Sequence, residues 1–170
     1  MNNLRSYLHK FDTFFEAEPA LVLAWLTPFR THEQEDLYDM PRFTVHERTA
    51  TSARASCANA ITVEEHEFEL DSPFTWSRRT QICDHRGKAL AIVVATESVE
   101  PNGVGCLHKI QKKLTPATPA ASRALSRDHR SKSLLEKRAY QDHAQALAQR
   151  VRRSMAPIEV RAAHGRSSTP

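Results

Sequence analysis

Glycine is scarce in this sequence: the 170 residues contain only Gly87, Gly103, Gly105 and Gly165. Loops that cradle phosphates need closely spaced glycines at the start of a helix, and the isolated pair Gly103 and Gly105 is too weak a signal for one. The GxSxG sequence of serine hydrolases is absent as well. Neither a nucleotide-binding loop nor this class of serine hydrolase is therefore expected.

Paired cysteines and paired metal-binding histidines are also missing. The three cysteines, Cys57, Cys83 and Cys106, form no CxxC, and the nine histidines form no HExxH. This excludes a disulfide framework and the common zinc motifs. The acidic stretch EEHEFE at 64–69 is interpreted as the solvated face of a strand rather than as a metal site. We expect neither a metal nor a cofactor.

Long apolar runs are lacking too. The longest near the N-terminus, ALVLAWL at 20–26, is short and follows acidic residues, so it resembles neither a signal peptide nor a membrane-spanning helix. Unpaired cysteines suit a reducing compartment. The sequence therefore predicts a cytoplasmic protein with no membrane span.

The charges are divided unevenly along the chain. Residues 1–100 hold 10 basic and 16 acidic residues, whereas residues 101–170 hold 14 basic and 4 acidic ones. The basic run at 109–132 is a possible nucleic-acid contact, whose affinity would depend steeply on salt. Because this run has no interleaved aromatic residues for base stacking, nucleic-acid binding ranks last among the functions considered.

Apolar spacing predicts the secondary structure. Leu4, Tyr7, Leu8, Phe11, Phe14 and Phe15 follow one another at spacings typical of an amphipathic helix over 3–16. A second helix is predicted at 19–26, and a charged connector at 30–41. Short alternating segments follow between residues 42 and 98, and the segments 74–83 and 88–98 flank a DHRG turn as a hairpin. These segments indicate an antiparallel sheet of about four strands.

The last third of the chain is expected to be helical. LHKIQKKL at 107–114 is predicted as a short basic helix ended by Pro116 and Pro119, and 131–153 as the clearest helix, with Leu135 and Leu147 on its apolar face. Residues 161–170 lack an apolar pattern and are predicted to be disordered. The fold class is α+β, with a central antiparallel sheet flanked by N-terminal helices and a long C-terminal helix. Residues 1–155 form one domain, and 156–170 a tail.

One strand carries a charge among residues that favour burial. In FTWSRRTQIC, Trp76, Arg78, Thr80 and Ile82 share one face because strand side chains alternate, and Arg79 lies on the other. An inward arginine is costly unless it is paired. Two interpretations remain open. Arg78 either pairs with a glutamate at 64–69 or extends its charged end to the sheet edge, or it binds an anionic ligand through two parallel hydrogen bonds from its guanidinium.

The stretch WSRRTQICDHRGKALAIVVATES resembles the central hairpin of the chorismate lyase family, in which a Trp-x-Arg strand leads to a turn and a second apolar strand. PALVLAWL, RFTVHERTA and LHKIQKKLTPATPAASRAL are similar to further family segments in the same order, so the resemblance covers roughly residues 19–130. The family arginine that binds a ligand carboxylate corresponds to Arg78. The family's final hairpin, which carries a catalytic glutamate, is replaced here by a helix and by APIEV at 156–160.

The resemblance implies elimination of pyruvate from chorismate to give 4-hydroxybenzoate, a quinone precursor, without metal or cofactor. Arg78, with Thr80 and Trp76, would bind the substrate, and Glu159 would be the catalytic acid. The first alternative is a noncatalytic domain that binds a small aromatic carboxylate; the second is a basic nucleic-acid-binding protein. Nothing in the sequence indicates the oligomeric state.

Overall fold

The computed structural model describes residues 4–29 and 43–155, apart from the side chains of 128–132 and 154–155. Within these ranges the chain forms seven strands and two helices. In chain order they are β1 (Tyr7–Phe15), α1 (Pro19–Leu26), β2 (Thr44–Arg48), β3 (Ser52–Ala58), β4 (Thr62–Ser72), β5 (Thr75–Asp84), β6 (Ala89–Asn102), β7 (Gly105–Pro116) and α3 (Pro119–Met155).

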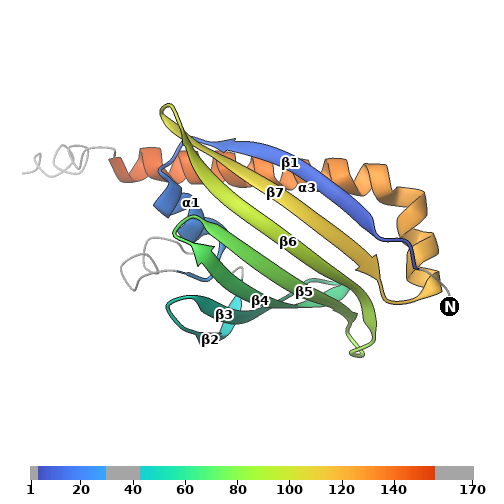
Figure 1. The fold of residues 1–170 in the computed structure, drawn as a ribbon. Helices are drawn as coiled ribbons and strands as arrows, with labels where there is room; N and C mark the ends of the chain where they lie inside the picture. Colours follow the sequence, from blue (N-terminus) through green and yellow to red (C-terminus); the bar gives the residue numbers. More distant parts are fainter. Residues whose placement is uncertain (1–3, 30–42, 156–170) are drawn as a thin grey trace, which may run out of the picture.

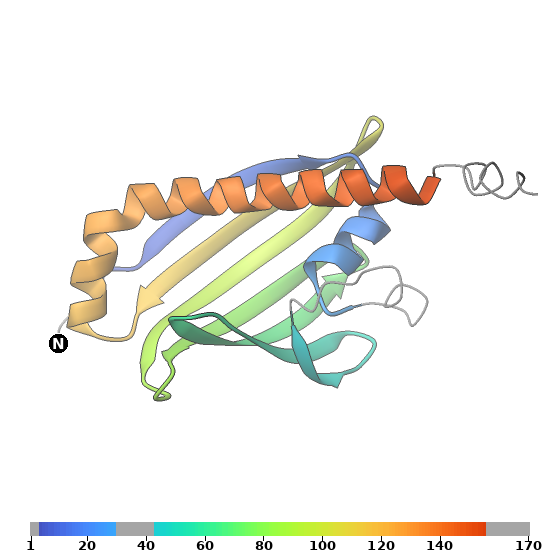
Figure 2. The same ribbon diagram turned by 180° about the vertical axis from the view of Figure 1, so that it is seen from behind.

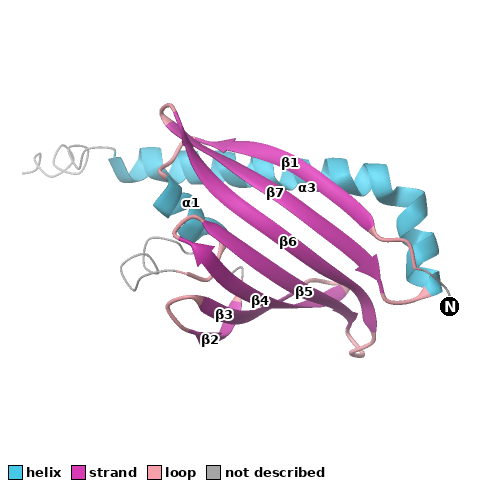
Figure 3. Ribbon diagram, viewed as in Figure 1, coloured by secondary structure: helices cyan, strands magenta, loops and turns pink. Residues whose placement is uncertain are grey.

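The strands form one antiparallel sheet in the order β1-β7-β6-β5-β4-β3-β2. Neighbours from β2 to β7 are also neighbours in the sequence, whereas β1 pairs with the last strand, β7. Figure 1 shows the sheet curving around α3, and the reverse view in Figure 2 shows α1 and α3 on the same side of it. We call the sheet surface under the two helices the inner face. The predicted α+β class with a long C-terminal helix is thus confirmed (Figure 3).

The core lies between the inner face and the helices. Its largest fully buried side chains include Phe15 from β1, Trp25 from α1, Trp76 from β5 and Leu147 from α3. Burying an apolar side chain of this size contributes about 1.5–3 kcal/mol. The core therefore joins elements that are far apart in the sequence and fixes how α3 lies across the sheet.

Two predicted elements are confirmed and two are wrong. The helix at 19–26 matches α1, and the hairpin at 74–98 matches β5 and β6. Residues 7–15, expected to be helical, form β1 instead: its inward residues alternate strictly, and Leu8 and Phe14, which suggested helical spacing, are exposed. The predicted basic helix at 107–114 is likewise a strand, β7.

The C-terminal helix is longer than its apolar pattern predicted. It begins at Pro119, where the missing amide hydrogen of proline costs nothing, rather than near residue 131. The sheet has seven strands instead of about four, because β1, β7 and the separate short strands β2 and β3 were not all recognised. Neither described helix is long and apolar enough to cross a membrane. The connector 30–41 and the tail 156–170 lie outside the described residues.

The turn between β6 and β7 brings β7 very close to the end of β1. Gly103 has a φ of 63°, a conformation that glycine adopts readily. A Cβ atom at Gly105 would overlap the carbonyl oxygen of Phe15. The absence of a side chain at Gly105 therefore permits the close approach of β7 to the end of β1.

Candidate functional site

Arg78 lies on the inner face of β5, as strand alternation predicts. Its side chain is 15% exposed, whereas Arg79 on the opposite face is exposed. Trp76 and Thr80, two residues to either side, are buried on the same inner face. The three residues predicted to bind a substrate are therefore brought to one surface, although their role there stays a prediction.

The ion-pair partner of Arg78 is Glu97 on β6. The guanidinium Nη2 lies 2.8 Å from Oε1 of Glu97, whose side chain is only 2% exposed. This partner differs from the one expected from the sequence, a glutamate at 64–69; three of those glutamates, at 65, 67 and 69, are exposed. The sequence does indicate that Glu97 points inward, because it occupies the same face of β6 as four buried apolar residues: Ala91, Val93, Ala95 and Val99.

Glu97 also holds a buried histidine. Nε2 of His108, on β7, lies 3.0 Å from Oε2 of Glu97, and the His108 side chain is fully buried. The imidazole stacks on Trp76 with ring centroids 5.7 Å apart and an interplanar angle of 3°. It also contacts Tyr140 of α3, at 5.2 Å between centroids. Strand and helix residues thus fix the orientation of this ring.

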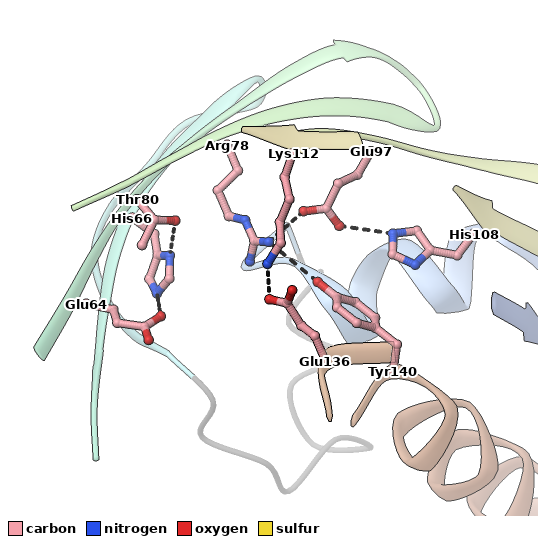
Figure 4. Close-up of polar contacts among 9 residues, drawn as sticks. All are labelled: Glu64, His66, Arg78, Thr80, Glu97, His108, Lys112, Glu136 and Tyr140. Atoms are coloured by element: carbon pink, nitrogen blue, oxygen red, sulfur yellow. Dashed lines mark hydrogen bonds and ion pairs between the residues drawn. The ribbon is translucent and has the colours of Figure 1, made fainter. Parts of the chain in front are cut away.

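Helix α3 contributes two polar side chains to the same region. Arg78 Nη2 donates to the hydroxyl of Tyr140 at 3.5 Å, and Glu136 forms an ion pair with Lys112 of β7. Glu136 also lies 3.4 Å from Nδ1 of the buried His9. Figure 4 shows Arg78, Lys112 and Glu97 reaching from the sheet toward Glu136 and Tyr140. We call Arg78, Glu97, His108, Lys112, Glu136 and Tyr140 the inner polar cluster.

The charges of the buried pair reinforce each other. Burial alone would raise the pKa of Glu97, but attraction by Arg78, the hydrogen bond from His108 and the charge of Lys112 outweigh it, and the pKa falls below its ordinary value. Burial alone would lower the pKa of Arg78, but Glu97 and Tyr140 raise it. Both groups are therefore ionised around neutral pH.

Lys112 is a cation in an unfavourable position. Burial and then repulsion by Arg78 lower the pKa of Lys112 to about 8, while Glu97 and Glu64 act in the opposite direction. Its contact with Glu136 likewise favours the charged form. In the sequence Lys112 belonged to the basic run 109–132, but the structure turns its side chain inward, away from any surface patch.

Several buried polar atoms in this region have no hydrogen-bond partner among the described residues. They are Nε1 of Trp76, Nε of Arg78, Nδ1 of His108 and Oε1 of Glu97, whose contact with Arg78 is an ion pair. Leaving a buried donor unsatisfied costs about 1–3 kcal/mol. The described contacts of Arg78 with Glu97 and Tyr140 both use Nη2, so its buried Nε–H is the donor left without an acceptor among the described residues.

A second group of polar side chains lies on β4 and β5. Nδ1 of His66 is 2.9 Å from the hydroxyl of Thr80, and Nε2 is 3.6 Å from a carboxylate oxygen of Glu64 (Figure 4). Burial and repulsion by Arg78 lower the pKa of His66 to about 4, so its ring is neutral near pH 7. Glu64 and His66 therefore face inward, unlike the exposed glutamates of the same acidic stretch.

A hollow of mixed charge lies on the outer face of the sheet. Most of its lining side chains, Arg54, Glu65, Glu67, Arg79 and Gln81, point outward; His46 and the inward-facing Ala55 and His66 complete the lining. Its cations Arg54 and Arg79 face the acids Glu65 and Glu67, and all four residues are exposed to water. Exposed, balanced charges bind ligands weakly, so we place the candidate site at the inner polar cluster. Glu159 lies outside the described residues, and its catalytic role stays a prediction.

Comparisons with known proteins identify the fold. No family model and no curated protein sequence matches the chain. Among solved structures, the ZhuI aromatase/cyclase from Streptomyces sp. R1128 is 12% identical, with a TM-score of 0.57 over 89% of this chain and 98% of that one. A truncated norcoclaurine synthase from Thalictrum flavum is 10% identical, with a TM-score of 0.55 over 87% and 96%.

A protein from Thermus thermophilus is similar to the same extent. It is 14% identical, with a TM-score of 0.56 over 88% of this chain and all of its own length. At these identities the likeness shows a shared fold and leaves the chemistry to be argued from the site itself.

Proposed function

We propose that this protein binds a small aromatic carboxylic acid on its inner face. The observation that carries the proposal is the buried Nε of Arg78, which has no hydrogen-bond partner among the described residues, while Nη2 contacts Glu97 and Tyr140. A carboxylate accepts two parallel hydrogen bonds from a guanidinium, which stays charged when desolvated. The indole N–H of Trp76, on the same face of β5 and likewise without a described partner, is a further donor.

The surroundings of Arg78 favour an aromatic ligand. Its guanidinium lies 5.9 Å from the ring centre of Phe68, and the rings of Trp76 and Tyr140 flank the neighbouring His108. Aromatic side chains beside a few directed polar groups are typical of small-molecule sites. The likeness of fold to an aromatase/cyclase and to norcoclaurine synthase supports a small-molecule function on general grounds.

Replacing Arg78 with lysine should weaken binding of 4-hydroxybenzoate by on the order of 10–100-fold, because lysine keeps the charge but loses the planar grip. Isothermal titration calorimetry on the whole chain measures this directly. Arg79→Lys is the matched control, since Arg79 is the next residue and points to the opposite face. The Arg79→Lys variant should bind 4-hydroxybenzoate as tightly as the original protein. Equal weakening in both variants, or no binding by the original protein, would refute the proposal.

A more specific proposal is elimination of pyruvate from chorismate, motivated by the hairpin resemblance. Arg78 would hold one carboxylate of this dianionic substrate. Glu97 is an unsuitable general acid because its lowered pKa keeps it ionised near neutral pH. Glu159 therefore remains the proposed acid for the leaving ether oxygen.

Incubation with chorismate should then release pyruvate, which a coupled lactate dehydrogenase assay detects. Glu159→Gln should lower the rate by about 100-fold or more while 4-hydroxybenzoate binding is preserved, as expected for loss of a general acid. Binding of the aromatic acid without pyruvate release would reject the enzyme and retain the binding protein.

A further inference from the structure

Three potential metal ligands meet on neighbouring strands of the inner face. Cys57 on β3 is directly opposite Glu64 on β4 in the strand register, and His66 is two residues further along the same face of β4. Their donor atoms, Sγ, a carboxylate oxygen and Nε2, all lie within 4.8 Å of one another. This arrangement depends on the pairing of β3 with β4, so no local sequence motif predicts it.

The separations of the donor atoms fit a single small cation. Sγ of Cys57 lies 3.3 Å from Nε2 of His66 and 3.9 Å from Oε2 of Glu64, and the last two atoms are 3.6 Å apart. With Zn–S near 2.3 Å and Zn–N and Zn–O near 2.1 Å, tetrahedral geometry requires roughly 3.4–3.6 Å between donors. Shifts of a few tenths of an ångström would bring all three atoms to bonding distance.

Thr80 orients the imidazole in the way that metal sites require. Its hydroxyl lies 2.9 Å from Nδ1 of His66, and Thr80 is the direct partner of His66 in the pairing of β4 with β5. An Nδ1–H donated to this hydroxyl leaves the lone pair of Nε2 facing Cys57 and Glu64. Such an outer contact on the second ring nitrogen accompanies nearly all histidine ligands.

We propose that Cys57, Glu64 and His66 bind a zinc-type divalent cation through three protein ligands, with Thr80 as the positioning residue. A thiolate, a carboxylate and a neutral imidazole together balance the charge of Zn²⁺. The thiolate disfavours Mg²⁺ and Ca²⁺, which prefer oxygen ligands. Three protein ligands leave one tetrahedral position for water or for a ligand group, which is the pattern of reactive rather than purely structural zinc sites.

Cobalt titration of the whole metal-free chain tests this site. Co²⁺ should produce a thiolate-to-cobalt charge-transfer band in the near ultraviolet together with the visible bands of tetrahedral cobalt, and one equivalent of Zn²⁺ should abolish both. Cys57→Ser should remove the charge-transfer band. Glu64→Gln, a conservative change at a partly exposed side chain, should weaken cobalt binding at least ~10-fold.

Matched control variants distinguish cobalt binding at this site from nonspecific cobalt binding and from loss of folding. Cys83→Ser and Glu65→Gln change the same residue types outside the site and should leave the cobalt spectrum and affinity unchanged. Thr80→Val should weaken binding by about 10–100-fold while keeping the charge-transfer band, because it disturbs only the orientation of His66. Circular dichroism verifies that each variant is folded.

The proposal is overturned if no charge-transfer band forms at saturating Co²⁺, or if the band survives in Cys57→Ser. It is equally overturned if folded Glu64→Gln binds cobalt as tightly as the original chain. These outcomes are independent of 4-hydroxybenzoate binding, because the cobalt titration contains no organic acid and leaves Arg78 unaltered.

Discussion

Replacing Arg78 with alanine is expected to lower the free energy of unfolding by about 3–5 kcal/mol, because the change leaves the buried carboxylate of Glu97 without its cation. Glu97 is 2% exposed and lies 2.8 Å from the guanidinium. Its remaining described partner, His108, does not replace a fixed charge. Urea unfolding at pH 7, monitored by circular dichroism, measures the loss.

A double-mutant cycle shows how much of this loss comes from the unpaired charge. Glu97→Leu alone should also be strongly destabilising, whereas the double variant Arg78→Met with Glu97→Leu should cost much less than the two single changes together. Arg79→Ala, an exposed neighbour, should change stability by less than about 0.5 kcal/mol. Additive effects in the cycle, or a loss below about 1 kcal/mol for Arg78→Ala, would contradict a buried ion pair.

The ion pair between Arg78 and Glu97 also determines how stability changes at acid pH. Because the folded pKa of Glu97 lies below its ordinary value of 4.5, its ionisation stabilises the fold above that value. This contribution is lost as the pH falls through the lowered folded pKa. Arg78→Ala removes the main attraction, so its stability should depend less on pH in this acid range.

The second large effect is expected in helix α3. Leu147→Ala should lower the free energy of unfolding by about 2–5 kcal/mol, because the leucine side chain is fully buried in the core and its removal leaves a cavity. The same core cluster includes Phe15 and Trp25, which belong to different elements. Their positions are fixed by those elements, so they cannot move together to fill the cavity. Thermal or urea unfolding measures the change.

Leu135→Ala is the control on the same helix. Leu135 was predicted on the apolar helix face together with Leu147, but its side chain is 63% exposed. Its replacement by alanine, which favours helix, should therefore alter stability by less than about 0.5 kcal/mol. Similar losses at the two positions would show that α3 packs on the sheet differently from the arrangement in Figure 2.

The sequence predicted best those elements whose inward residues are apolar. The hairpin of β5 and β6 and the helix α1 have such patterns. In β1 and β7, by contrast, inward positions are occupied by His9, Thr13, His108 and Lys112, and these polar residues obscure the alternation. β1 and β7 were therefore not recognised as strands. Strand prediction uses the alternation of apolar and polar residues, and polar residues at inward positions remove that alternation.

Glu97, as the ion-pair partner of Arg78, could not be predicted from the sequence for a different reason. Alternation alone places Arg78 inward, but its neighbours depend on the register between strands. β5 and β6 pair so that Arg78 is opposite Ala95, which puts Glu97 diagonally beside it. Tyr140 and Glu136 reach the cluster only because α3 crosses the sheet at one particular place, and no local pattern encodes that crossing.

The pairing of β1 with β7 has a consequence for the order in which the chain is made. Leu114 pairs with Tyr7 but is synthesised 107 residues later (114 − 7), which corresponds to roughly 5–20 s of translation. During that time β1 has no partner strand, and its inward residues Tyr7, Phe11 and Phe15 lack helix α3, which packs on them in the finished fold. β1 can therefore join the sheet only after β7 has emerged from the ribosome.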